Sequence, residues 1–100
     1  MRGYELSLAA RQDLWAISEY YRGEAGEEVA ARVVAKIEEK CRMIAETRGS
    51  LGRFRPDIGE DVRSFPVPPH LLFYRLTAET MYVARILHGR QDIGPELFGE

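Results

Sequence analysis

The sequence predicts an α+β fold of the order β-α-α-β-β-β, in which a hairpin of two helices packs on one face of a mainly antiparallel, four-stranded sheet. Two observations predict it. Two apolar stripes with helical spacing occupy the first half of the chain. Short runs rich in aromatic and branched side chains, separated by turn residues, fill the second half. Helices and strands segregated in this way are typical of α+β domains.

Size and composition limit the function classes. One hundred residues with 45% hydrophobic side chains predict a single domain, residues 1–100, with one modest core. Fourteen basic and sixteen acidic residues, with a pI near 5.7, weigh against a nucleic-acid-binding domain. No segment approaches the roughly 20 apolar residues that span a bilayer, so we expect no membrane association. Cys41, the only cysteine, permits no intrachain disulfide, which fits a cytoplasmic protein.

The chain opens with a short predicted strand and a helix. Residues 3–8 alternate in polarity and predict a strand that buries Tyr4, Leu6 and Leu8. Ser7 is expected to cap the helix that follows and runs to about Gly23. The inward stripe of this helix, at spacings of four, three and four, consists of Ala10, Leu14, Ile17 and Tyr21.

A second helix is predicted after the break at residues 23–26. Glu27 and Glu28 would lie in its first turn, where carboxylates favour the positive helix end, and Gly49 would end it. The short connection predicts an antiparallel helical hairpin. We expect Cys41 to be a small buried hydrophobe rather than a nucleophile. The inward stripe consists of Ala30, Val33, Ile37, Cys41 and Ile44.

Three strands are predicted in the second half. Residues 49–59, rich in glycine, form a loop, and residues 61–66 form a strand that the following prolines end. Residues 70–76 and 81–88 form a β-hairpin, and the apolar tail at residues 93–98 docks back on the body.

Neither face of this hairpin is polar. Strict alternation places Phe73 and Ile86 on one face and Tyr74, Arg85 and Leu87 on the other. We therefore expect helices on one face and a further cover, partly masking apolar side chains, on the other.

No metal or cofactor motif is present, so we expect neither a metal site nor a cofactor. One hypothesis is a metal-free ribonuclease that uses Tyr74, Arg85 and His88 as acid, base and phosphate-stabilising groups. In the structural alternative, His88 only closes its strand, and Arg75 or Arg85 pairs with Asp61, Asp92 or a helix carboxylate.

Several residues are candidates for binding a partner. Trp15 lies about 100° off the inward stripe of its helix and either caps the edge of the core or is an exposed anchor. The arginines of the second half give a local positive patch on an acidic chain. The complete set of candidates is Trp15, Arg53, Arg55, Arg63, Arg75, Arg85 and Arg90.

The chain resembles the RelE/ParE superfamily of toxin–antitoxin toxins, specifically its ParE branch. The resemblance is in order and covers nearly the whole chain. It rests on residues 4–8 (Tyr-Glu-Leu-Ser-Leu), 10–21, 49–53, 62–67 (Val-Arg-Ser-Phe-Pro-Val), 72–75 (Leu-Phe-Tyr-Arg) and 86–92 (Ile-Leu-His-Gly-Arg-Gln-Asp).

The resemblance implies a bacterial toxin neutralised by a cognate, ParD-like or related antitoxin in a hetero-oligomeric complex. Operator DNA would be bound only through the antitoxin, whose flexible segment would cover the apolar sheet surface. DNA gyrase is the target that the ParE branch implies, and ribosome-dependent mRNA cleavage is the RelE-like alternative. The acidic pI and the absence of lysine after Lys40 favour gyrase inhibition.

Overall fold

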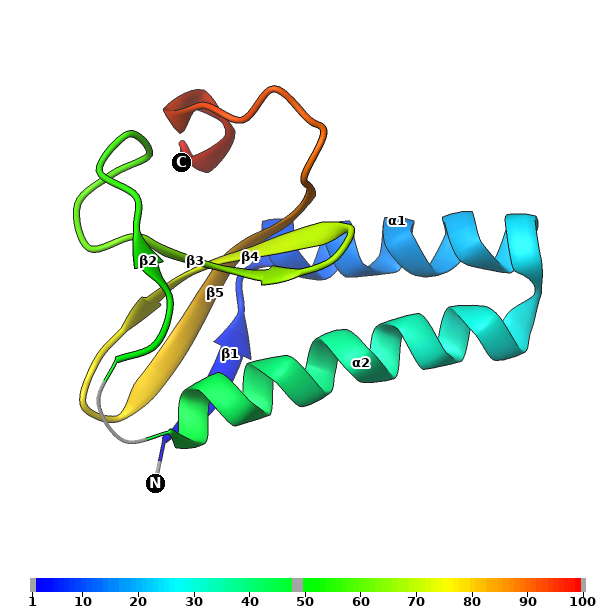
Figure 1. Cartoon of the computed structure of the whole chain (residues 1–100), viewed down its shortest axis with the longest axis horizontal. Coiled ribbons are helices and arrows are strands. Elements are labelled where there is room, and N and C mark those ends of the chain that lie inside the picture. Colours follow the sequence, from blue (N-terminus) through cyan, green and yellow to red (C-terminus); the bar gives the residue numbers. More distant parts are fainter. Residues whose placement is uncertain (1, 48–49, 100) are drawn as a thin grey trace.

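The computed structural model describes residues 2–47 and 50–99. It confirms the α+β fold, with both helices on one side of the sheet (Figure 1). The elements in chain order are β1 (Gly3–Leu6), α1 (Leu8–Ala25), α2 (Glu27–Glu46), β2 (Arg53–Phe54), β3 (Arg63–Val67), β4 (His70–Leu76), β5 (Thr80–His88) and a 3-10 helix, η1 (Pro95–Phe98).

The sheet has five strands, one more than the sequence predicts. Their spatial order is β1-β5-β4-β3-β2; β1 pairs with β5 in parallel and all other pairs are antiparallel. The added strand, β2, contributes only Arg53 and Phe54, which pair with Ser64 and Arg63. Two residues are too few to show the alternation that predicts a strand, so this segment resembles a loop in the sequence.

The ends of α1 follow from local chemistry. The Ser7 hydroxyl accepts the backbone N–H of Ala10 at 2.9 Å, which confirms the predicted cap. Gly26 ends the helix with φ +93°, a conformation that favours glycine. The strand prediction is wrong at Leu8, which is the first residue of α1 and is 70% exposed. From Gly26 the chain turns directly into α2, and the connected end of the helical hairpin projects beyond the strands (Figure 1).

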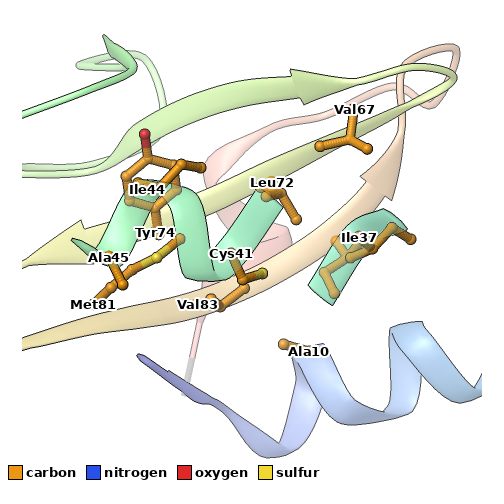
Figure 2. Packing of buried hydrophobic residues seen from close by; sticks show 11 residues of the cluster. Ala10, Ile37, Cys41, Ile44, Ala45, Val67, Leu72, Tyr74, Met81 and Val83 are labelled. Atoms are coloured by element: carbon orange, nitrogen blue, oxygen red, sulfur yellow. The ribbon is translucent and has the colours of Figure 1, made fainter. Parts of the chain in front are cut away.

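The main core lies between the helices and the sheet. Figure 2 shows Ile37, Cys41 and Ile44 of α2 facing Leu72 and Tyr74 of β4, and all five side chains are buried. Burial raises the pKa of the Cys41 thiol to about 12. The predicted stripe of α2 and the prediction that Cys41 is a buried hydrophobe are therefore confirmed.

The opposite face of the sheet is covered by the chain itself. Ile58 and Val62, from the segment between β2 and β3, pack on Phe73 and Leu87. The tail docks on the same cluster, as predicted, through Ile93, Leu97 and Phe98. Much of the apolar surface that the sequence leaves without a partner is thus covered within the domain.

A β-bulge changes which residues share a face. Phe73 pairs with Arg85 but Tyr74 pairs with Val83, so Ala84 has no partner of its own. Strict alternation therefore fails beyond Ala84. Ile86 joins the helix-side core, whereas Leu87 packs on the other face.

We predict that Gly52→Ala destabilises the protein. A Cβ at Gly52 would lie 2.0 Å from the Tyr74 hydroxyl and 2.9 Å from the Ser64 carbonyl oxygen, and φ is +92°. Tyr74 cannot easily retreat, because it is buried and donates a hydrogen bond to the Leu51 carbonyl at 2.8 Å. We expect a loss of about 2 kcal/mol or more in the free energy of unfolding, measured by urea denaturation.

The control is Gly23→Ala in α1, where an added Cβ meets nothing within 4 Å. Since alanine is the better helix former, this variant should gain about 0.5–1 kcal/mol. Equal stabilities of the two variants would contradict the proposed clash at Gly52.

Candidate functional site

The outer face of α1 exposes large apolar side chains. Leu8 is 70% exposed, Trp15 is 66% exposed and Tyr20 is 62% exposed. Leu8 and Trp15 are seven residues apart, so they lie one above the other two turns along the helix. Of the two interpretations of Trp15, the structure shows the exposed one. Large exposed aromatic side chains of this kind are typical of protein interfaces.

A groove lies between α1 and the end of the β4–β5 pair, on the side of the helix that carries Tyr20. Its volume is about 420 Å³, and its lining residues are Ala16, Ile17, Tyr20, Tyr21, His70 and His88. The rings form a chain of edge-to-face contacts, with centroid distances of 5.2 Å for Tyr20–Tyr21, 6.5 Å for Tyr21–His70 and 5.6 Å for His70–His88. Among residues 2–47 and 50–99, no acidic side chain, lysine or arginine lines the groove, so an apolar side chain fits it best.

The two histidines of the groove come from directly paired positions of β4 and β5. His70 is 6% exposed, and burial, followed by the charge of His88, lowers the pKa of its imidazole. His88 accepts the backbone N–H of Arg90 at Nδ1, 3.0 Å away. Among the described residues, no group of three or more His, Cys, Asp or Glu side chains could hold a metal ion.

An ion pair fastens α1 to β5 beside this groove. The Asp13 carboxylate accepts hydrogen bonds from Arg85 Nε at 2.7 Å, Arg85 Nη2 at 2.8 Å and the Ile86 backbone N–H at 2.9 Å. Arg85 Nη1 also donates to the Leu97 carbonyl at 2.7 Å. The side chains of Asp13 and Arg85 are only 14% and 21% exposed. Arg85 thus joins a helix, a strand and the tail.

Comparisons with known proteins agree with this architecture. Residues 4–93 match the family model described as the ParE toxin of type II toxin-antitoxin system, parDE. The chain belongs to the ParE toxin family. One relative, Toxin ParE3 of Caulobacter vibrioides, is 40% identical over 47 residues, which are 47% of this chain and 47% of that protein. The match therefore spans about half the length of this curated relative.

A solved structure shows the same ParE-like fold. It is described as the chromosomal ParDE TA system from P. aeruginosa, and the similarity has a TM-score of 0.72 at 24% sequence identity. The superposition covers 88% of this chain and 96% of that one.

In this ParE-family chain the three candidate ribonuclease residues do not form one site. Tyr74 is buried, and burial raises the pKa of its hydroxyl to about 12. Arg85 is held by Asp13. His88 pairs with His70, which is four residues from Tyr74 along β4. At about 3.3 Å per residue, roughly 13 Å of strand separates the positions of His88 and Tyr74.

The basic residues do not form the single patch that the sequence suggests. Arg55 pairs with Asp57 at 2.9 Å and lies over the Phe73 ring, so it braces the second face of the sheet. Arg53, Arg63 and Arg75 lie at the β2 end of the sheet, whereas Arg90 follows β5 beside His88.

Sequence reasoning missed several surface residues. Leu8 was predicted to lie on the buried face of a strand, Tyr20 was assigned to no surface, and His70 was not a candidate, although each is exposed on α1 or lines its groove. One signal was available: α1 carries apolar side chains on two sides, more than one buried face requires. For His70 no signal exists, because its contact with His88 depends on strand register.

No helix in residues 2–47 or 50–99 is long and apolar enough to cross a bilayer.

We predict that Asp13→Asn destabilises the ParE-family fold by about 3 kcal/mol, because it leaves the half-buried Arg85 guanidinium without a countercharge. For a domain of this size the melting temperature should fall by roughly 10 °C or more. Differential scanning calorimetry measures this shift.

Glu19→Gln is the matched control, since Glu19 forms an ion pair with Arg22 on the open surface of the same helix. It should cost less than about 1 kcal/mol. A similar loss from both variants would show that Asp13 contributes only surface charge.

We predict that stability falls as the pH drops below about 6.5, through His70. In the unfolded chain this imidazole takes up a proton near its usual pKa of 6.5, whereas its folded pKa is lower. The unfolded state therefore binds more protons below pH 6.5, and the free energy of unfolding decreases there. Urea denaturation of wild type and His70→Phe at pH 7.5 and 5.5 measures the effect. The variant should lose less stability between these pH values, and identical losses would rule out His70 as the cause.

Proposed function

We propose that the chain is a toxin that inhibits DNA gyrase and is neutralised by a ParD-like antitoxin bound along the outer face of α1. The proposal of an antitoxin-binding site rests on the apolar surface of α1, formed by Leu8, Trp15 and Tyr20 with the groove beside Tyr20. These side chains contribute little to the protein's own core, so their exposure needs another explanation.

The shape of this surface favours a helical segment of the antitoxin. Leu8 and Trp15 follow the axis of α1, whereas Tyr20 lies about 140° around the helix from Trp15 and lines the groove with aromatic, aliphatic and histidine side chains. An amphipathic helix laid in the groove would place apolar residues at successive turns against Tyr20 and the groove, and an adjoining part of the same segment would pass over Trp15. Such a segment can be disordered until it binds, which suits an antitoxin that must release its toxin.

Gyrase inhibition is supported over RNA cleavage by the positions of the candidate catalytic groups. A ribonuclease needs an acid, a base and a cation that converge on one phosphate. Here Tyr74 is buried and Arg85 is paired with Asp13. Of these three candidate catalytic residues, only His88 lines the surface groove. The net charge of −2 also disfavours docking on ribosomal RNA.

The antitoxin part is tested by Trp15→Ala and Tyr20→Ala, with Tyr82→Ala as the control. Tyr82 is 46% exposed and lies in β5 between Met81 and Val83, which point into the helix-side core, so Tyr82 faces the other way. Isothermal titration with the antitoxin from the same operon should show at least about tenfold weaker binding for both α1 variants. An unchanged affinity would place the antitoxin elsewhere.

The target is tested by a supercoiling assay with purified DNA gyrase, with and without the antitoxin. We expect the toxin to block supercoiling or trap cleaved DNA, and the antitoxin to reverse this. The variant His88→Ala should keep full activity. Ribosome-dependent mRNA cleavage that falls about 10²-fold in His88→Ala would instead support the RelE-like alternative.

A further inference from the structure

We propose that the β2 edge of the sheet is a second protein-binding surface, and that it takes an acidic segment of the toxin's target. This inference rests on the proposed function, because it assumes a target distinct from the antitoxin. We call this surface the β2 edge and define it by Arg53, Phe54, Arg63 and Arg75 with the hollows beside them.

An aromatic–arginine stack forms its centre. Phe54 is 56% exposed, and the guanidinium carbon of Arg63 lies 3.8 Å from the centroid of its ring. Arg63 Nη1 also donates to the Gly52 carbonyl at 3.3 Å. The stack fixes both side chains before any partner arrives, which lowers the entropy cost of binding. Aromatic residues and arginine are the side chains most enriched in the centres of interfaces.

Two hollows flank Phe54 and give a partner places to insert side chains. The first has a volume of about 310 Å³ and is lined by Phe54, Pro56, Gly59, Glu60 and Asp61. The second has a volume of about 230 Å³ and shares Phe54 and Asp61 with the first. Arg63, Arg75 and the hydroxyl residues Ser50 and Thr77 complete its polar lining.

The charge of the second hollow indicates an acidic ligand. Among the described residues, its lining includes two guanidinium groups and one carboxylate, Asp61. Within the described part of the chain, no carboxylate forms an ion pair with Arg53, Arg63 or Arg75. Their donors can therefore bind a carboxylate of the partner, for which the fork of a guanidinium is well suited.

The surrounding residues favour a protein over a nucleic acid. Phe54 and Pro56 add apolar surface beside the arginines, which side chains of a protein segment can cover. The whole chain carries a net charge of −2, which opposes the approach of a long polyanion. A protein segment with one or two carboxylates meets the arginines without this general repulsion.

The β2 edge is separate from the surface proposed for the antitoxin. In the strand order, β2 lies at the opposite edge of the sheet from β1 and β5, to which α1 is fastened. Substitutions at one surface should therefore leave the other unchanged, and this separation makes the proposal testable.

The experiment compares Phe54→Ala and Arg75→Gln with Arg32→Gln, a control at an exposed arginine on α2. Each toxin is assayed for growth arrest on induction, for inhibition of purified DNA gyrase, and for antitoxin affinity by titration. We expect both β2-edge variants to need at least about tenfold more toxin for half-inhibition of gyrase and to lose growth arrest. Their melting temperatures and antitoxin affinities should match those of the control.

The outcomes separate the two proposals. If the wild type arrests growth without inhibiting gyrase, and only the β2-edge variants lose arrest, the surface is supported and the gyrase target is wrong. Full growth arrest by these variants, no arrest by the wild type, or a matching loss of antitoxin affinity would each overturn the β2-edge proposal. Direct binding of the wild type to duplex DNA in a gel-shift assay, lost in Arg75→Gln, would also overturn it by showing a nucleic-acid ligand.

Discussion

The open edge of β5 is the constraint on which much of this structure depends. β1 pairs with β5 only as far as Val83, so the backbone groups that follow need other partners. α1 and its cap provide them: the Ser7 hydroxyl donates to the Ala84 carbonyl at 2.8 Å, and the Asp13 carboxylate accepts the Ile86 N–H at 2.9 Å. These two contacts give partners to the Ala84 carbonyl and to the partly buried Ile86 N–H, and they fix α1 where a further strand would otherwise lie.

The attachment of α1 to β5 determines which side of α1 enters the core and how the tail is held on the other face of the sheet. With Asp13 turned toward β5, the side of α1 that carries Trp15 faces outward and the side that carries Ala10 enters the core. Arg85 extends the same contact to the carbonyl of Leu97, which holds the tail against the second face of the sheet. One carboxylate and one guanidinium thus couple the helix-side core to the smaller core beneath the tail.

The sequence predicts the parts of the fold that depend on local patterns. Helix stripes such as Ile37 to Ile44, the Ser7 cap and the β4–β5 hairpin were visible because neighbouring residues encode them. The bulge at Ala84 could not be seen in the sequence, because it depends on how β4 and β5 pair. For Arg85 the sequence left several possible ion-pair partners, namely Asp61, Asp92 or a helix carboxylate. It could not single out Asp13, because Asp13 lies 72 residues away in the chain.

The candidate site could not be predicted fully from the sequence either. Here the exposure of a side chain, rather than its residue type, distinguishes structural from functional residues. Tyr74 and Arg85 have the chemistry of a ribonuclease, yet the fold uses one as a buried hydrogen-bond donor and the other as an internal ion-pair partner. Trp15 and Phe54 have no catalytic chemistry, but they are large, apolar and exposed at separate places. A domain that buries its reactive groups and exposes its aromatic ones is suited to act by binding other proteins.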